Sequence, residues 1–89
     1  MKILGTNLCI ECRKAAERLQ QLGMKYEYTD FTDSIEALKE FIKFRDAHKE
    51  FDFARAEGKI GIPCFLFENG EFTFDLEDAI AKLRQSSLS

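Results

Sequence analysis

The dipeptide Asn69-Gly70 constrains the fold of this chain more than any other local feature. It separates two runs rich in strand-forming residues, residues 64–68 and 71–74. Asn-Gly between two such runs is the strongest short-range signal for a β-hairpin, because both residues tolerate the positive φ that a tight hairpin turn requires. We therefore predict two antiparallel strands joined by a turn in which Asn69 and Gly70 both have positive φ.

The first third of the chain predicts a strand, a helix and a second strand. Residues 2–5 form an apolar-rich run that ends in turn-forming residues. From residue 8 to 22 apolar positions recur at spacings of three and four, and Gly23 then supplies the usual left-handed stop. Residues 25–31 alternate as a strand does. A connection of this length returns the chain parallel to the first strand, with a right-handed crossover.

A second helix is expected from Asp33 to about His48. Asp33 and Glu36, three residues apart, resemble a capping box at its start. The inward side of this helix is expected to carry Ile35, Leu38, Phe41, Ile42 and Arg45. Residues 51–57 predict a short extra helical turn or a loop before the glycines and the proline that follow.

The last helix follows the hairpin and is expected to be capped by Asp75. Its inward residues are predicted to be Leu76, Ala79, Ile80 and Leu83. The predicted order is therefore β-α-β-α-β-β-α, and a strand as apolar as residues 64–67 needs helices on both faces of the sheet. Because 89 residues with 45% apolar content fit one compact core, we expect an α/β fold with a four-stranded mixed sheet in a single domain, residues 1–89.

Composition excludes several classes of partner. A formal net charge of −3 argues against nucleic-acid binding, which needs a clustered excess of Lys and Arg. The first residues, MKILGTNL, are too short and too polar for a signal peptide, and no apolar run approaches the length of a membrane span. We therefore expect a cytoplasmic protein with no membrane partner. Three cysteines do not make an even disulfide framework, so a catalytic or metal-binding role is favoured for them.

The tetrapeptide Cys9-Ile10-Glu11-Cys12 places two thiols at the start of the first predicted helix. Unpaired backbone N–H groups and the positive end of the helix dipole favour an anion at Cys9, whereas Cys12 lies one turn deeper. Dithiol exchange needs one exposed thiolate and a second thiol within its reach. We therefore expect Cys9 to attack disulfides and Cys12 to resolve the mixed disulfide that forms.

The alternative for this pair is a structural role or half of a zinc site. A closed zinc site needs four ligands, and besides the pair only Cys64 and His48 remain as candidates. His48 falls at the charged end of a predicted helix, so we interpret it as a surface residue and expect no metal site. Cys64 has two interpretations: a small hydrophobe packed at the start of a strand, or an auxiliary redox thiol.

Pro63, the only proline of the chain, follows Gly61 and Ile62 directly before a predicted strand. A strand-entry proline is the simplest explanation, since proline donates no ladder hydrogen bond. Together with a β-α-β unit whose helix starts at a CxxC motif, however, this segment resembles the cis-proline loop that faces the active cysteines in glutaredoxins and thioredoxins. Over nearly its full length the chain is similar to the glutaredoxin family, within the thioredoxin-like superfamily.

This resemblance implies a thioredoxin-like fold and a thiol–disulfide oxidoreductase that reduces protein or low-molecular-weight disulfides without a bound cofactor. It implies substrate contacts by Pro63 and by the backbone of Ile62. Glutathione is the candidate electron donor, and the two acids that hold its amino group in the family match Glu77 and Asp78. The chain has Phe74-Asp75 where the family usually has Gly-Gly, so helix capping is the alternative role of these acids.

The resemblance also implies the partners. These are a disulfide-containing protein or a glutathione mixed disulfide, and a reducing system based on glutathione or on thioredoxin reductase. We expect a monomer. Two other functions stay open at this point: an iron–sulfur cluster carrier, in which the first cysteine and glutathione bridge a cluster between two subunits, and a redox-sensing adaptor module, in which the cysteine pair switches a partner surface.

Overall fold

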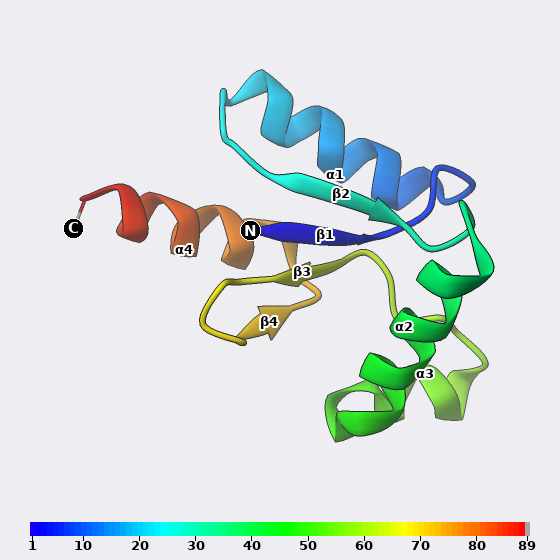
Figure 1. Ribbon diagram of the computed structural model, residues 1–89. Coiled ribbons are helices and arrows are strands. Elements are labelled where there is room, and N and C mark those ends of the chain that lie inside the picture. Colours follow the sequence, from blue (N-terminus) through cyan, green and yellow to red (C-terminus); the bar gives the residue numbers. More distant parts are fainter. Residues whose placement is uncertain (89) are drawn as a thin grey trace.

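The structure, a computed structural model, describes residues 1–88 and shows an α/β fold with a four-stranded mixed sheet (Figure 1). In chain order the elements are β1 (Lys2–Gly5), α1 (Ile10–Gln21), β2 (Glu27–Asp30), α2 (Ile35–Ala47), the 3-10 turn η1 (Lys49–Phe51), α3 (Asp52–Glu57), β3 (Cys64–Leu66), β4 (Phe72–Thr73) and α4 (Leu76–Leu88). The predicted order of the main elements is confirmed. Residues 51–57, for which a short helical turn or a loop was predicted, are helical.

The strands lie in the order β2-β1-β3-β4. β1 runs parallel to β2, with Gly5 opposite Asp30, and β3 runs antiparallel to β1, with Cys64 opposite Leu4. β4 runs antiparallel to β3, with Thr73 opposite Phe65. The last residues of β1, β2 and β4 and the first residue of β3 therefore share one end of the sheet, which we call the carboxyl end of β1.

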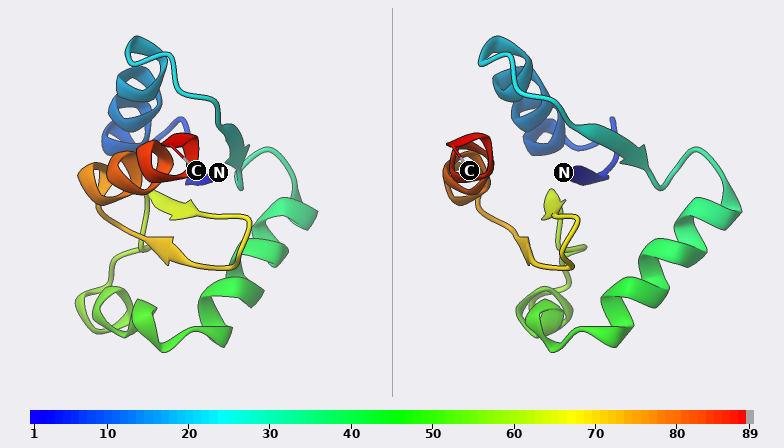
Figure 2. Two further views of the ribbon diagram at one scale, coloured as in Figure 1. Left: turned by 90° about the vertical axis from the view of Figure 1, so that its left-hand side faces the viewer. Right: turned by 60° about the vertical axis from the view of Figure 1, so that its left-hand side comes forward.

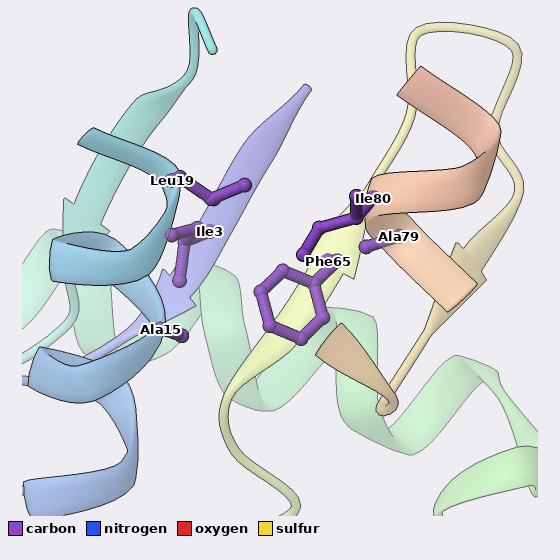
Figure 3. Packing of buried hydrophobic residues seen from close by; sticks show 6 residues of the cluster. All are labelled: Ile3, Ala15, Leu19, Phe65, Ala79 and Ile80. Atoms are coloured by element: carbon purple, nitrogen blue, oxygen red, sulfur yellow. The ribbon is translucent and has the colours of Figure 1, made fainter. Parts of the chain in front are cut away.

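Helices cover both faces of the sheet, as predicted (Figure 2). Ile3 and Phe65 alternate with neighbours that point the other way, because side chains along a strand leave opposite faces. Both pack against α1 and α4 in a buried cluster (Figure 3) completed by Ala15, Leu19, Ala79 and Ile80. The other face carries a second cluster, formed with α2 and η1 by Phe31, Phe41, Phe51 and Cys64.

The start of α2 differs from the prediction. The N-cap is Ser34, whose Oγ accepts a hydrogen bond from the backbone N–H of Ala37 at 3.0 Å. The predicted capping box of Asp33 and Glu36 is therefore wrong. Asp33 instead donates its backbone N–H to the carbonyl of Asp30, 3.1 Å away, and so belongs to the turn after β2.

The buried stripe of α2 also differs from the prediction. Phe41 is buried, and Leu38 and Phe44 pack against the same cluster, whereas Ile35 and Ile42 are 61% and 45% exposed. Apolar residues occupy more than one stripe of this helix, so periodicity alone does not select the stripe that meets the sheet. Phe44 contacts Phe51 and Phe72, with ring centroids 5.8 and 5.2 Å apart. These aromatic contacts determine which side of α2 faces the sheet.

The hairpin lies where Asn69-Gly70 predicts it, but its turn is of another kind. Phe67 donates its backbone N–H to the carbonyl of Glu71 at 2.8 Å, and Gly70 donates to the carbonyl of Phe67 at 3.0 Å. The loop thus holds three residues, and only Gly70 has positive φ, 92°. The prediction of positive φ at Asn69 is wrong, because a third loop residue leaves one left-handed position rather than two.

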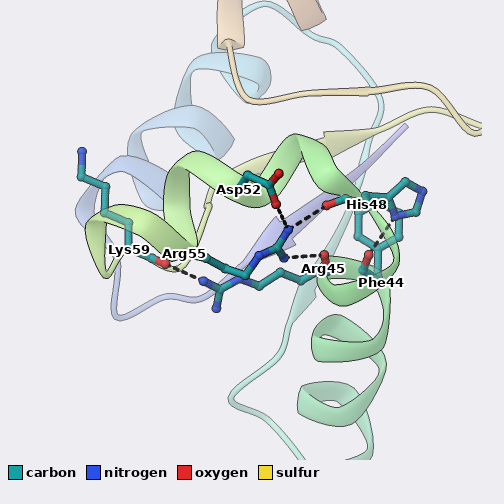
Figure 4. Close-up of polar contacts among 6 residues, drawn as sticks. All are labelled: Phe44, Arg45, His48, Asp52, Arg55 and Lys59. Carbon is teal, nitrogen blue, oxygen red and sulfur yellow. Dashed lines mark hydrogen bonds and ion pairs between the residues drawn. The ribbon is translucent and has the colours of Figure 1, made fainter.

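A network of arginine contacts ties α3 to the end of α2 (Figure 4). Arg55 donates to the carbonyls of Arg45 and His48, at 3.0 and 3.4 Å, and forms an ion pair with Asp52. Arg45 donates to the carbonyl of Lys59 at 2.9 Å. The carbonyls of Arg45 and His48 also accept backbone N–H groups, from His48 and Phe51, so Arg55 adds a second donor to each. The bond from Arg45 to Lys59 links the end of α2 to the chain that leads to Pro63.

His48 is half-buried rather than a solvated surface residue. Its ring lies against Phe44 and Phe72, with centroids 4.4 and 5.1 Å apart, and its Nδ1 is 2.8 Å from the carbonyl oxygen of Phe44. The prediction treated the charged neighbours of His48 in sequence as its surroundings. Packing of β4 against α2 places an aromatic side chain there instead.

The segment before β3 depends on Gly61. Its φ is +94°, and a Cβ added there would lie 2.6 Å from Cδ1 of Phe51, a side chain that is fully buried. The backbone of the loop therefore rests directly on the aromatic cluster. Only glycine combines this φ with this close approach.

Candidate functional site

The sequence-predicted site residues lie on segments that adjoin the carboxyl end of β1. Cys9 follows β1 after a short turn, Pro63 directly precedes β3, and the first turn of α4, with Glu77 and Asp78, follows β4. Because β1, β3 and β4 are neighbours in that order, the three segments lie side by side at one end of the sheet. The Ile62–Pro63 peptide bond is cis, as the resemblance implies.

Cys9 is the N-cap residue of α1. Its backbone is extended, with φ −99° and ψ 121°, and its Sγ accepts a hydrogen bond from the backbone N–H of Cys12 at 3.4 Å. Its own carbonyl accepts the first helical bond, from Arg13 at 3.1 Å. The sulfur is thus partly exposed at the end of a helix where free N–H groups and the helix dipole favour negative charge.

Cys12 lies beneath Cys9 and is fully buried. It packs onto the backbone of Gly5, where a Cβ would come within 2.7 Å of the Cys12 sulfur. Burial raises the pKa of Cys12 to about 12, opposed by a backbone hydrogen bond from Thr6 and reinforced by its hydrogen bond and charge interaction with Cys9. The two cysteines therefore have distinct environments: one thiol is accessible, and the other is protonated and enclosed.

The turn that presents Cys9 is anchored to the end of β2. One carboxylate oxygen of Asp30 accepts the backbone N–H of Asn7 at 3.0 Å, and the other accepts the backbone N–H of Thr32 at 2.8 Å and also its hydroxyl. The Thr32 hydroxyl lies 3.0 Å from that of Thr6, which accepts the backbone N–H of Leu8. Sequence reasoning missed this anchor, although a short polar side chain at the end of a strand beside the CxxC turn was a signal for it.

Tyr28 is a second residue that sequence reasoning missed. It lies on β2 opposite Ile3, and hence on the face of the sheet that α1 covers. Its hydroxyl is buried, and among residues 1–88 it meets no group in hydrogen-bond geometry. Burial, followed by the charges of Cys12, Asp30 and Cys9, raises the pKa of Tyr28 to about 12. The absence of a side chain at Gly5 opens the space that Tyr28 and Cys12 share.

Cys64 lies on the opposite face of the sheet from α1. It is paired with Leu4 and is fully buried among Phe31, Phe41 and Phe51. Burial raises the pKa of the Cys64 thiol to about 12. These surroundings favour the interpretation as a packed small hydrophobe over that of an auxiliary redox thiol.

Comparison with known proteins finds a relative in Haemophilus influenzae. An uncharacterized protein of that organism is 37% identical to this chain over 68 residues, which make up 76% of this chain and 79% of the relative. The two proteins belong to one family. No protein-family model matches the chain, and no solved structure matches it.

The first turn of α4 carries acidic residues that are exposed. Asp75 caps the helix as predicted: its Oδ1 accepts the backbone N–H of Glu77 at 3.1 Å and its carbonyl accepts that of Ala79 at 3.0 Å. Glu77 and Asp78 are exposed in the first turn, where negative charge suits the helix dipole. Phe74 packs against Phe51, with ring centroids 4.9 Å apart.

Exposed apolar side chains flank the accessible thiol. Leu8 is 83% exposed and Ile10 is 58% exposed, directly before and after Cys9. Ile60, in the loop that leads to Pro63, is 46% exposed. Large apolar side chains in such positions gain free energy only when a partner covers them.

Within residues 1–88, no group of three or more His, Cys, Asp or Glu side chains is arranged to hold a metal ion. In the same part of the chain, no helix has both the length and the apolar character needed to cross a membrane.

Replacing Asp30 by asparagine is expected to remove a pH-dependent contribution to stability. Hydrogen bonds from Thr32 and from the backbone of Asn7 lower the pKa of Asp30 from 3.8 to about 2. A carboxyl with a lowered folded-state pKa stabilises the folded protein above its unfolded pKa, and this contribution is lost as the pH falls from about 4 towards 2. Urea unfolding at pH 6, 4 and 2.5 checks this: the stability difference between wild type and Asp30→Asn is expected to shrink towards acid, and a constant difference would contradict it.

Proposed function

We propose that the protein is a thiol–disulfide oxidoreductase of the glutaredoxin family that reduces protein or low-molecular-weight disulfides through Cys9 and Cys12. The observation that carries this proposal is the contrast between the two sulfurs. Cys9 Sγ is partly exposed at the N-cap of α1 and accepts the Cys12 N–H at 3.4 Å, while the Cys12 thiol is fully buried one turn below it. This arrangement suits an attacking thiolate and a resolving thiol.

The topology supports a thioredoxin-like form of the α/β fold. A helix that starts at the CxxC motif connects two parallel strands, and the strand on the other side of β1 is antiparallel and begins directly after Pro63. The sheet order β2-β1-β3-β4, with α1 and α4 on one face and α2 on the other, is further support for this part of the proposal.

The chemistry follows from the two environments. The Cys9 thiolate attacks one sulfur of a substrate disulfide, a bond forms between Cys9 and that sulfur, and the other substrate sulfur leaves as a thiolate. Cys12 then loses its proton and attacks Cys9 Sγ, which releases the reduced substrate and leaves a Cys9–Cys12 disulfide. An external thiol reductant, glutathione or the thioredoxin reductase system, returns the two electrons.

The surface around Cys9 favours protein disulfides as substrates. Leu8 and Ile10, both exposed, offer apolar contact on either side of the reacting sulfur, and a polypeptide covers more of that area than a tripeptide does. In this proposal Ile62 and Pro63 contact the substrate backbone, and Glu77 and Asp78 are the candidate contacts for the amino group of glutathione. We also propose a monomer that works in the reducing cytoplasm, where both thiols stay free.

Replacing Cys12 by serine is expected to stop the reaction at the mixed disulfide. Wild-type protein treated with dithiobis(nitrobenzoate) should release two equivalents of nitrothiobenzoate, the second when Cys12 displaces the first adduct. The Cys12→Ser variant should release one and keep the adduct on Cys9 with a lifetime at least about 100-fold longer, because an external thiol lacks the proximity of Cys12. Absorbance at 412 nm follows release, and mass spectrometry of peptides locates the adduct.

The matched control is Cys64→Ala, which removes the remaining thiol on the far face of the sheet and should release two equivalents as wild type does. An adduct found on Cys12 or Cys64 in place of Cys9 would contradict the proposal. Parallel assays with glutathione plus its reductase and with thioredoxin reductase then identify the electron donor. Reversible oxidation without turnover in either assay would favour the adaptor module, and a coloured protein after reconstitution with iron and sulfide would favour the cluster carrier.

A further inference from the structure

The hydroxyl of Tyr28 and the sulfur of Cys12 share one buried space beside Gly5. A Cβ placed on Gly5 would lie 2.7 Å from Cys12 Sγ and 3.5 Å from the Tyr28 hydroxyl oxygen, so both atoms border the same point. Tyr28 reaches this point from β2 and Cys12 reaches it from α1. The two side chains thus meet above the backbone of the central strand β1.

The Tyr28 hydroxyl lacks a hydrogen-bond partner in this state of the protein. It is buried, and none of the described residues accepts or donates a bond to it in good geometry. A buried hydroxyl without a partner costs about 1–3 kcal/mol, and native structures contain few of them. Such a group is explained when another chemical state of the site provides its partner.

We propose that Tyr28 donates a hydrogen bond to the Cys12 thiolate at the moment when Cys12 resolves the mixed disulfide. This inference rests on the proposed function and assigns Tyr28 a direct contact with a reacting atom. A protonated thiol is a weak acceptor, whereas a thiolate accepts a charge-assisted bond, which is roughly twice as strong as a neutral one. The contact between the Tyr28 hydroxyl and Cys12 therefore becomes a strong hydrogen bond only when Cys12 has lost its proton.

The charges around the pair agree with this order of events. Besides each other, the groups that act on Cys12 and Tyr28 are the backbone of Thr6, Cys9 at the start of α1 and Asp30 at the end of β2. While Cys9 is free, its hydrogen bond and its charge oppose ionisation of Cys12. When Cys9 is joined to a substrate sulfur, its sulfur carries no charge and this opposition ends. Because the pKa of Tyr28 is raised to about 12, the hydroxyl keeps its proton and serves only as a donor.

The step balances without any further reactant. The proton of Cys12 passes to water or to a buffer base, and the thiolate electron pair forms the bond between Cys12 Sγ and Cys9 Sγ. The bond between Cys9 and the substrate sulfur breaks, and that sulfur leaves with the bonding pair as a thiolate. Tyr28 gives up no proton and forms no covalent bond, so it stabilises the charge on Cys12 before the attack.

The test is Tyr28→Phe, which removes the hydroxyl and keeps the ring. With dithiobis(nitrobenzoate) in a stopped-flow instrument, the first release reports attack by Cys9 and the second reports resolution by Cys12. The second step is expected to slow about 10-fold, with the midpoint of its pH profile shifted upward by about one unit, while the first step keeps its rate. Stability should stay the same or rise, since an unpartnered buried hydroxyl is removed.

Tyr26→Phe is the matched control. The Tyr26 hydroxyl lies 2.9 Å from the side-chain amide of Gln20 and 3.3 Å from the carbonyl of Ala16, near the other end of α1 from Cys12. Its removal should leave both steps unchanged. An unchanged second step in Tyr28→Phe would overturn the inference, and so would an equal slowing of both steps, which indicates a general packing role. Failure of the first step in the wild-type protein would instead overturn the proposed function.

Discussion

Replacing Cys9 by serine is expected to abolish thiol–disulfide exchange, with a fall of at least about 1000-fold in the rate of mixed-disulfide formation. A serine hydroxyl stays protonated at neutral pH and does not attack disulfides. Cys12 offers no substitute, because it is fully buried and its pKa is raised to about 12. Cys64 offers none either, since it is enclosed in the aromatic cluster on the other face of the sheet.

The measurement is the initial rate of reduction of a disulfide-linked peptide, with either reducing system in excess. Circular dichroism of the Cys9→Ser variant should match that of wild type, because serine is also a good N-cap for α1 and accepts the Cys12 N–H. A difference in activity between wild type and Cys9→Ser then reports the loss of the sulfur alone, because the variant keeps the fold. Full activity in Cys9→Ser would refute the assignment of the attacking thiol.

Replacing Gly61 by alanine is expected to destabilise the protein by about 2–5 kcal/mol. Positive φ costs an L-residue roughly 1–2 kcal/mol, and overpacking a filled core adds about 1–3 kcal/mol. The added Cβ would lie 2.6 and 2.8 Å from two ring atoms of Phe51. Phe51 cannot move aside freely, because its ring contacts Phe72 and Phe74 with centroids 5.8 and 4.9 Å away.

Gly58→Ala is the matched control for this substitution. Gly58 ends α3 with φ +70°, but a Cβ there would meet no atom within 4 Å. The Gly58→Ala variant should therefore lose only the stability that positive φ costs an alanine, about 1 kcal/mol. Urea denaturation of both variants measures the difference. Equal losses at the two glycines would show that the contact between Gly61 and Phe51 contributes nothing to stability.

Several features that the sequence predicted correctly are local. The CxxC motif at the start of α1, the cap at Asp75 and the position of the hairpin each depend on residues within one turn of each other, and local rules describe such segments well. The backbone conformation of the hairpin turn was harder to predict from the sequence, because it depends on the number of residues in the loop. The sign of φ at Asn69 followed from a third residue in the turn, which the dipeptide alone does not reveal.

The features that the sequence did not reveal depend on contacts between distant segments. Ile35 and Ile42 fit a helical stripe as well as Phe44 does, and only the aromatic rings of η1 and β4 decide which stripe is buried. In the candidate site, the cysteines were found from their spacing. Asp30 and Tyr28 were missed because the parallel register of β1 and β2 brings them beside the CxxC turn, and register is a property of the folded sheet.

The Cys9 sulfur is at once the cap of α1 and the group that the proposed reaction oxidises. The bond from the Cys12 N–H therefore stabilises the dithiol form more than the disulfide form, in which the sulfur is a poorer acceptor. Any such difference raises the reduction potential, by about 30 mV for each 1.4 kcal/mol. The strength of this capping bond and the reduction potential of the cysteine pair are therefore linked. Mutations that alter the first turn of α1 are expected to change that potential.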